Sequence, residues 1–244
     1  MNITNELWAS ARQAFYAGTL FLLAAALAFF CFFVIVLTVF RFVDPPTSAV
    51  MLRDHFAGAR VRHEWTPIEN ISPNLVRAVI SSEDARFCSH YGVDLHEWKE
   101  VMRTVDRDGI GAVRGASTIT MQVAKNLFLW TDRSLLRKGL ELAITPIIEL
   151  AWPKRRIIEV YLNIAQWGPG LFGVGVAARH HFNREPIDLT PTEAALLTAS
   201  LPAPSVRRPG AATRYTRRIA NRIKVRMRPD NVRTDCVFGD RDDK

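Results

Sequence analysis

Residues 17–40 form an apolar run of 24 residues that contains no charged side chain. An α-helix rises about 1.5 Å per residue, so a helix of this length crosses a hydrocarbon core about 30 Å thick. A cleaved signal peptide is the alternative interpretation. The run is longer than the apolar core of such a peptide, and Arg41 and Asp44 follow it in place of small residues suited to cleavage. The sequence therefore predicts a retained membrane anchor that spans the bilayer once.

The orientation of this anchor does not follow from its flanking charges. Arg12 precedes the run, whereas Arg41 and Arg53 follow it, so the usual excess of positive charge on cytoplasmic loops gives no preference. Long domains cross the membrane largely regardless of their charge. A domain outside the cytoplasm is therefore compatible with the rest of the chain.

The chain carries 32 Lys and Arg against 24 Asp and Glu, which gives a net charge of +8. Nine of the basic residues, and no acidic residue, lie between Arg207 and Arg228. An excess of this kind favours an anionic partner: nucleic acid, a membrane surface or a phosphorylated substrate.

Within this basic run, apolar or aromatic residues recur at every fourth position: Tyr215, Ile219, Ile223 and Met227. The pattern predicts an amphipathic helix that packs by one face, with a basic face that could meet anionic lipid head groups. Aromatic residues that would stack on bases are nearly absent from the run, so we expect no nucleic-acid partner.

The three cysteines, Cys31, Cys88 and Cys236, are widely spaced and form no CxxC pair. Their spacing matches no metal-ligand pattern. We interpret them as structural or incidental.

After the anchor the sequence reads mainly as helices, without sustained alternation of apolar and polar residues. Ser72 and Pro73 fit the N-cap and first position of one helix, and Thr190 with Glu193 fits a capping box at the start of another. Pro146 falls inside a longer predicted helix and is expected to kink it. The predicted fold class is mainly α, with 48% hydrophobic residues to form a core.

The stretch GASTITMQVAKN, residues 115–126, combines a short apolar helix with polar residues at particular positions. Ser117 is the predicted N-cap. Every fourth residue from Ile119 is apolar and forms the predicted buried stripe. Another face of the helix carries Thr118, Gln122 and Lys125. A solvated helix face is the ordinary alternative for such a pattern.

Two sets of charged residues could carry chemistry. Glu83 and Asp84 lie at the end of an apolar helix, where a carboxylate can have its ionisation shifted toward that of a general base or acid. Arg133, Arg137 and Glu141 recur at four-residue spacing along one helix face and could hold a phosphate-bearing group. The alternatives are a solvated helix end and a surface ladder of ion pairs. His90, nearby, more often has a structural role.

Several multi-residue motifs occur in the order typical of one enzyme family: EDARFCSHYG, GASTITMQVAKN, RKGLE, IIEVYLN, WGPGLFGVGVAARHHF and EAALLTASLPAPS. On these motifs the chain resembles the glycosyltransferases that polymerise peptidoglycan, in particular the monofunctional members of glycosyltransferase family 51. The same domain occurs in class A penicillin-binding proteins. The resemblance runs from the anchor to about Pro209. Met121 departs from it, because many members carry a second glutamine there.

The resemblance implies a lysozyme-like α-helical fold and the polymerisation of lipid II into β-1,4-linked strands with release of undecaprenyl diphosphate. Glu83 matches the base that takes the proton from the acceptor 4-hydroxyl, and Glu141 matches a second essential carboxylate. Nine further positions match residues that bind the substrate: Asp84, Ser117, Thr118, Gln122, Lys125, Asn126, Arg133, Arg137 and Lys138. No cofactor follows from the resemblance, and a divalent cation such as Mg²⁺ near the diphosphate stays an open alternative.

The implied partners are lipid II, the growing lipid-linked glycan and the membrane, with other cell-wall synthesis and division proteins as further candidates. The implied location is the inner membrane, with the catalytic domain on the periplasmic side. Five segments follow: a cytoplasmic segment at 1–16, a transmembrane helix at 17–40, a linker and domain start at 41–70, the glycosyltransferase domain at 71–210 and a basic helix and tail at 211–244.

Two other functions are compatible with parts of the sequence. A lysozyme-like enzyme that cleaves peptidoglycan also needs carboxylates, but a neutral glycosidic bond requires a protonated acid rather than a cluster of cations. Lys125, Arg133 and Arg137 therefore argue against it. A non-catalytic, basic, membrane-tethered binding protein is the second alternative, and the basic run near the C-terminus supports it.

Overall fold

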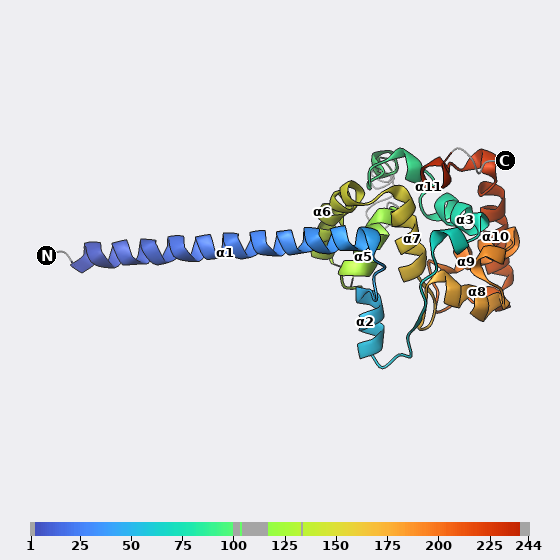
Figure 1. Ribbon diagram of the computed structural model, residues 1–244, viewed down its shortest axis with the longest axis horizontal. Helices are drawn as coiled ribbons and strands as arrows, with labels where there is room; N and C mark the ends of the chain where they lie inside the picture. Colours follow the sequence, from blue (N-terminus) through green and yellow to red (C-terminus); the bar gives the residue numbers. More distant parts are fainter. Residues whose placement is uncertain (1–2, 100–102, 104–116, 133, 240–244) are drawn as a thin grey trace. The chain divides into compact units, whose positions relative to one another are not determined.

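The computed structural model describes residues 3–99, 103, 117–132 and 134–239, and the chain divides into two units (Figure 1). The first unit contains one long helix, α1 (Ile3–Phe42). Within it, Phe15–Phe42 has a mean hydropathy of 3.1 and is long enough to cross a membrane. The helix that the apolar run predicts is thus confirmed, and its composition is compatible with a single-pass anchor.

The second unit, from Asp44 onward, is mainly α, as the sequence predicts. Its described α-helices are α2 (Ala49–Phe56), α3 (Pro73–Glu83), α5 (Ile119–Phe128), α6 (Leu135–Ala151), α7 (Lys154–Ile164), α8 (Val174–Phe182), α9 (Pro191–Ser200), α10 (Arg214–Arg226) and α11 (Asp235–Phe238). Short 3-10 helices connect them: η1 (Ile68–Asn70), η2 (Phe87–Ser89), η4 (Pro186–Asp188), η5 (Pro209–Ala211) and η6 (Pro229–Asn231).

A small sheet accompanies these helices, in the order β1–β3–β2. Its strands are β1 (Arg62–His63), β2 (Gln166–Gly168) and β3 (Leu171–Phe172). β1 pairs with β3 in parallel and β2 pairs with β3 in the antiparallel sense. These strands are not predictable from the sequence, because segments of two or three residues are too short to display alternation.

Helices α3 and α5 form the centre of the second unit. α3 packs against α9 and α10, whereas α5 packs against α6 and α7. Leu75 and Ile80 on α3 are fully buried, and so are Ile119 and Val123 on α5, which confirms the predicted apolar stripes. The C-terminus of α3 and the N-terminus of α5 carry most of the predicted site residues.

The predicted helix starts are partly confirmed. Thr190 and Glu193 form the capping box of α9. Ser72 and Pro73 occupy the expected positions in α3, but the Ser72 hydroxyl donates to Leu189 O at 3.0 Å and makes no capping bond. Pro146 lies inside α6, which continues to Ala151, so the expected kink stays a prediction.

The N-cap of α5 was predicted one residue too early. Thr118, not Ser117, is the N-cap, and its Oγ1 accepts the backbone N–H of Met121 at 3.2 Å. The Ser117 hydroxyl instead accepts a hydrogen bond of 2.8 Å from Lys138 Nζ. The sequence offers two adjacent hydroxyls that both suit capping, and the contact with Lys138 on α6 decides between them.

The amphipathic helix in the basic run is confirmed as α10, but one residue of its predicted buried face was wrong. Ile223 and Met227 are buried as expected, whereas Tyr215 is 61% exposed. Thr216 and Ala220 are buried in its place. A strict four-residue repeat drifts by about 40° per step around a helix of 3.6 residues per turn, so Tyr215 has left the packed face.

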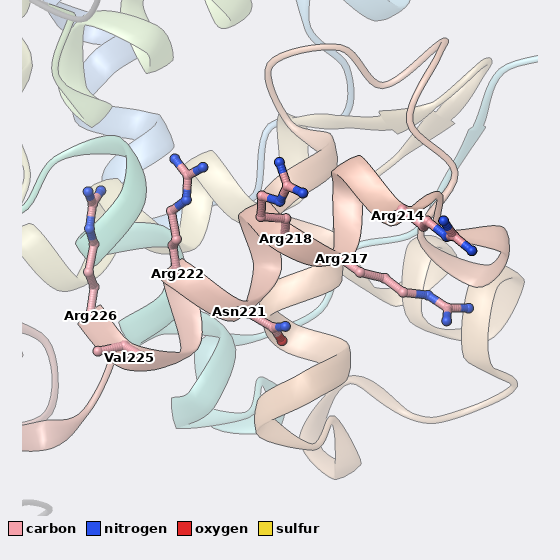
Figure 2. Close-up of a pocket in the computed structure, with 7 residues that line it drawn as sticks. All are labelled: Arg214, Arg217, Arg218, Asn221, Arg222, Val225 and Arg226. Carbon is pink, nitrogen blue, oxygen red and sulfur yellow. The ribbon is translucent and has the colours of Figure 1, made fainter.

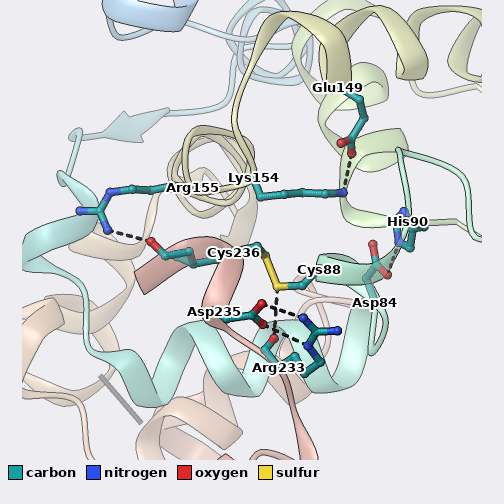
Figure 3. The surroundings of a disulfide bond; sticks show 10 residues. Asp84, Cys88, His90, Glu149, Lys154, Arg155, Arg233, Asp235 and Cys236 are labelled. Atoms are coloured by element: carbon teal, nitrogen blue, oxygen red, sulfur yellow. Dashed lines mark hydrogen bonds and ion pairs between the residues drawn. A yellow bond between two sulfur atoms is a disulfide. The ribbon is translucent and has the colours of Figure 1, made fainter. Parts of the chain in front are cut away.

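A disulfide joins Cys88 in η2 to Cys236 in α11 (Figure 3), with the two Cα atoms 5.5 Å apart. The two cysteines are separated by 148 positions, so their spacing gave no sign of a pair. Cys31, in α1, is free. Arg155 Nη1 also donates to Val237 O at 3.0 Å, which adds a second contact between α11 and the rest of the unit.

Replacing both cysteines of the disulfide, Cys88→Ser with Cys236→Ser, is expected to lower the free energy of unfolding by about 2–5 kcal/mol, the usual cost of losing a native disulfide. Denaturant unfolding of the full chain in detergent, followed by tryptophan fluorescence, measures the change. The matched control is Cys31→Ser, which should unfold as the wild type does. An equal loss in that control, or no loss in the double variant, would contradict the prediction.

Candidate active site

Glu83 is the last residue of α3, and its half-buried carboxylate faces α5. Burial raises the pKa of this carboxyl, while hydrogen bonds from Gln122 and Ser82 and the positive charge of Lys125 act in the opposite direction. A carboxylate with a raised pKa is a stronger proton acceptor than an ordinary one. Glu83 is therefore a candidate for a general base.

The amide of Gln122 connects Glu83 to α7. Gln122 Nε2 donates to Glu83 Oε2 at 3.2 Å, and Gln122 Oε1 accepts from the Tyr161 hydroxyl at 3.2 Å. Burial holds the pKa of Tyr161 well above its ordinary value, so this hydroxyl stays protonated and remains a donor. The amide oxygen must therefore face Tyr161, which leaves the amide nitrogen to face Glu83.

Lys125 lies nearly one turn beyond Gln122, in a cleft of about 210 Å³. Burial lowers the pKa of its ammonium, and so does the nearby charge of Arg137. Asn126, Tyr161 and Arg53, from α2, also line this cleft. A positive charge that is partly removed from water, beside further polar groups, is suited to an anionic ligand.

A cluster of charges at the start of α6 surrounds Glu141. Its carboxylate accepts from Arg137 Nη1 and, at 3.0 Å, from Lys138 Nζ. The Glu141 side chain is only 3% exposed, which excludes the surface ladder of ion pairs. Burial lowers the pKa of Lys138 to about 8, and the charges of Arg137 and Lys125 contribute to this shift. Lys138 also donates to Ser117, so the cluster is bound to the residue that precedes α5.

Asp84 and Thr118 make buried contacts that hold the segments together. Asp84 Oδ1 accepts from His90 Nε2 at 2.8 Å (Figure 3), and Asp84 Oδ2 accepts the backbone N–H of Ile119 at 3.0 Å. The Thr118 hydroxyl donates to Gly92 O at 2.5 Å. Gly92 has φ +84°, and a Cβ there would meet Thr145 on α6, so glycine allows this close approach.

The structure thus brings most of the predicted residues together. Gln122 donates to Glu83 and Lys125 lines a cleft beside Gln122, which excludes a purely solvated face on α5. Ser117, Arg137, Lys138 and Glu141 form one connected cluster. Arg133 lies outside the described residues.

Three residues that line the site were missed at the sequence level. Arg53 was considered only as a flanking charge of the anchor, and Tyr161 only as an apolar core position. Arg226, from α10, lines a second cleft of about 240 Å³ with Glu83, Ser117 and Thr118. The basic character of the C-terminal run was visible in the sequence, but its approach to Glu83 depends on how α10 packs against α3. Within the described ranges, no three His, Cys, Asp or Glu side chains gather as a metal site would require.

Comparison with known proteins gives a consistent result. A family model described as Transglycosylase matches residues 51–228. The chain is 49% identical over 208 residues to the biosynthetic peptidoglycan transglycosylase of Rhodospirillum centenum, an alignment that covers 84% of this chain and 89% of the relative. It is 47% identical over 192 residues to that of Brucella suis, with coverage of 79% and 85%. The relative from Haemophilus influenzae is 46% identical over 187 residues, with coverage of 72% and 76%.

The lowered pKa of Lys138 predicts a pH dependence of stability. The folded state releases this proton near pH 8, whereas an unfolded lysine holds it up to about pH 10.4. Between these values the unfolded state binds more protons, so the contribution of Lys138 to the free energy of unfolding rises with pH. The free energy of unfolding of the wild type minus that of Lys138→Gln, measured by denaturant unfolding, should therefore rise from pH 7 to pH 10. A difference that is flat or falls with pH would contradict the lowered pKa.

Proposed function

Because this chain belongs to the transglycosylase family, it is a peptidoglycan glycosyltransferase, and we propose that it polymerises lipid II into β-1,4-linked glycan strands with release of undecaprenyl diphosphate. One observation carries the mechanistic part of this proposal. A half-buried carboxylate with a raised pKa, Glu83, is hydrogen-bonded to the helix that presents Lys125 to a cleft. Transfer from a glycosyl diphosphate needs these two components: a base for the acceptor and positive charge for the leaving group.

In the proposed reaction, Glu83 accepts the proton of the acceptor 4-hydroxyl as that oxygen attacks the anomeric carbon of the donor. The new glycosidic bond forms as the bond between this carbon and the diphosphate oxygen breaks. The leaving diphosphate keeps the electron pair of the broken bond. A single displacement of this kind converts an α-linked donor to a β linkage and requires no covalent intermediate. Gln122 holds the carboxylate in place through its bond to Tyr161.

The cationic groups are placed to stabilise the leaving diphosphate. Burial is the main cause of the lowered pKa values of Lys125 and Lys138; the charge of Arg137 adds to both shifts, and the charge of Lys125 adds to that of Lys138. A bound dianion would offset the cost of burying these positive charges and reduce the repulsion among them. The site therefore gains more from a diphosphate than from a neutral ligand. Glu141 holds Arg137 and Lys138 in position, and we assign it this orienting role.

A lysozyme-like cleaving enzyme is less compatible with these contacts. Hydrolysis of a glycosidic bond uses two carboxylic groups that flank the scissile bond. Glu141 is enclosed by two cations and is therefore not free to act as the second group. The cluster of cations stabilises a leaving group only if that group is anionic.

We place the second unit on the periplasmic side of the inner membrane, anchored by α1. Two observations support this location. The Phe15–Phe42 segment suits a single-pass anchor. The disulfide between Cys88 and Cys236 suits an oxidising compartment such as the periplasm, because disulfides are rare in the reducing cytoplasm.

Exchanging each glutamate for glutamine separates their roles. Glu83→Gln keeps the shape of the side chain but removes the proton acceptor, so polymerisation of lipid II should fall by roughly 10²–10⁴-fold while substrate binding persists. Glu141→Gln should weaken substrate binding together with rate, because Arg137 and Lys138 lose their anionic partner. Polymer on gels and binding of a phosphoglycolipid inhibitor provide the two measurements. Near wild-type polymerisation by Glu83→Gln would end its assignment as the base.

The role of Lys125 has a separate test. Lys125→Ala should weaken binding of the phosphoglycolipid inhibitor by about ten- to a hundredfold, the usual effect of losing a hydrogen bond to a charged group, and should impair turnover as well. The matched control is Lys224→Ala, which removes a lysine whose contact is with Thr192 outside the cleft. Unchanged inhibitor binding in Lys125→Ala, or an equal loss in the control, would contradict contact between Lys125 and the diphosphate.

A further inference from the structure

Helix α10 carries a row of five arginines that lines a groove together with Asn221 and Val225 (Figure 2). The row consists of Arg214, Arg217, Arg218, Arg222 and Arg226. Four of its members recur at four-residue spacing and Arg217 adjoins Arg218, so the five positions are spread over about half of the helix circumference. Figure 2 shows Arg218, Arg222 and Arg226 extending from the same side of α10. From the first to the last arginine, the row extends over about 18 Å of helix.

The arginine row has no anionic partner within the part of the chain that the structure describes. Other arginines of the unit, such as Arg156 and Arg184, form ion pairs with glutamates. Like charges at four-residue spacing repel one another and disfavour the helix. Among the described residues no ion pair compensates these guanidinium groups, and only Arg226 shares a cleft with carboxylates such as that of Glu83. The row is therefore suited to a ligand that carries several negative charges.

The row leads directly to the proposed active site. Arg226 lines both the α10 groove and the cleft that contains Glu83. The position of Arg226 beside this cleft is fixed by packing, because α10 packs against α3, the helix that ends at Glu83, and against α9. A polymer that occupies the Glu83 cleft would therefore reach the other arginines by continuing along α10.

We propose that the arginine row of α10 binds the carboxylates of the stem peptides on a glycan strand, and so forms a binding site for the polymer outside the catalytic cleft. The proposal rests on the proposed function, which supplies a substrate of repeating peptide-bearing units. Each peptide ends in at least one carboxylate, and a carboxylate matches the planar fork of an arginine. A ligand with charges repeated along its length fits a row better than a small anion does.

A lipid surface is a less suitable occupant of the row. A helix that lies on a membrane buries its apolar face in the lipid. In α10 that face is already covered by protein, since Ala220 and Ile223 are buried. The more exposed apolar residues lie on α6, where Leu135 is 92% and Leu150 is 88% exposed, against 61% for Tyr215 and 56% for Val225 on α10. Within the second unit, α6 and α10 are on opposite sides (Figure 1).

Direct binding of defined polymers to the full chain in detergent tests the proposal. The probes are fluorescently labelled, uncrosslinked glycan strands that carry stem peptides, the same strands after an amidase has removed the peptides, and vesicles that contain anionic phospholipid. The double variant Arg218→Gln/Arg222→Gln should bind the peptide-bearing strands at least about tenfold more weakly, because two charge-assisted contacts are lost. Its binding of stripped strands should equal that of the wild type.

The matched control is Arg60→Gln/Lys224→Gln, which removes the same net charge from exposed positions outside the groove. It should bind all three probes as the wild type does. Unchanged binding of peptide-bearing strands by the arginine variant, an equal loss in the control, or a loss confined to the vesicles would overturn the proposal. Polymerisation of lipid II by the wild type is scored separately, so absence of that activity would overturn the proposed function without affecting the binding result.

Discussion

The buried carboxylate of Asp84 holds the end of α3 against the start of α5, and the geometry of the site depends on this contact. One oxygen accepts from His90 and the other from the backbone N–H of Ile119. The second bond also places a negative charge at the N-terminus of α5, where the helix dipole favours it. A hydrogen bond to a charged group typically contributes about 1.5–3 kcal/mol, and its loss would leave the Asp84 carboxylate buried without that partner. Glu83 directly precedes Asp84, so the contact that joins the two helices also fixes the position of the proposed base.

A second constraint is the concentration of positive charge opposite Glu83. Burial lowers the pKa values of Lys125 and Lys138, the charge of Arg137 adds to both shifts, and the charge of Lys125 adds to that of Lys138. Glu141 compensates part of the repulsion and Glu83 attracts Lys125, but two carboxylates do not neutralise three cations. The site therefore retains an excess of positive charge on side chains that are partly removed from water. That excess is costly for folding and favourable for binding a diphosphate, as is common where a fold is adapted to a charged ligand.

The sequence predicted the helices well, because they depend on local patterns, and the structure brings most of the candidate site residues together. Apolar periodicity identified α3 and α5, and the family motifs contained Glu83, Lys125 and Glu141. What it missed depends on contacts between distant segments. The choice of Thr118 over Ser117 as N-cap follows from Lys138, and the pairing of Cys88 with Cys236 follows from the position of α11. Patterns along the chain contain no information on which distant side chains will meet.

The disulfide joins two segments that are distant in the sequence. Cys88 lies five positions after Glu83, and Cys236 lies ten positions after Arg226, so the bond closes a small covalent connection between the base and the end of the arginine row. The packing of α10 on α3 holds the other side of this connection. A relative shift of α10 would therefore strain both the packed interface and the segment that carries Glu83. Both the disulfide and the packed interface therefore restrain the distance between the proposed polymer site and the base.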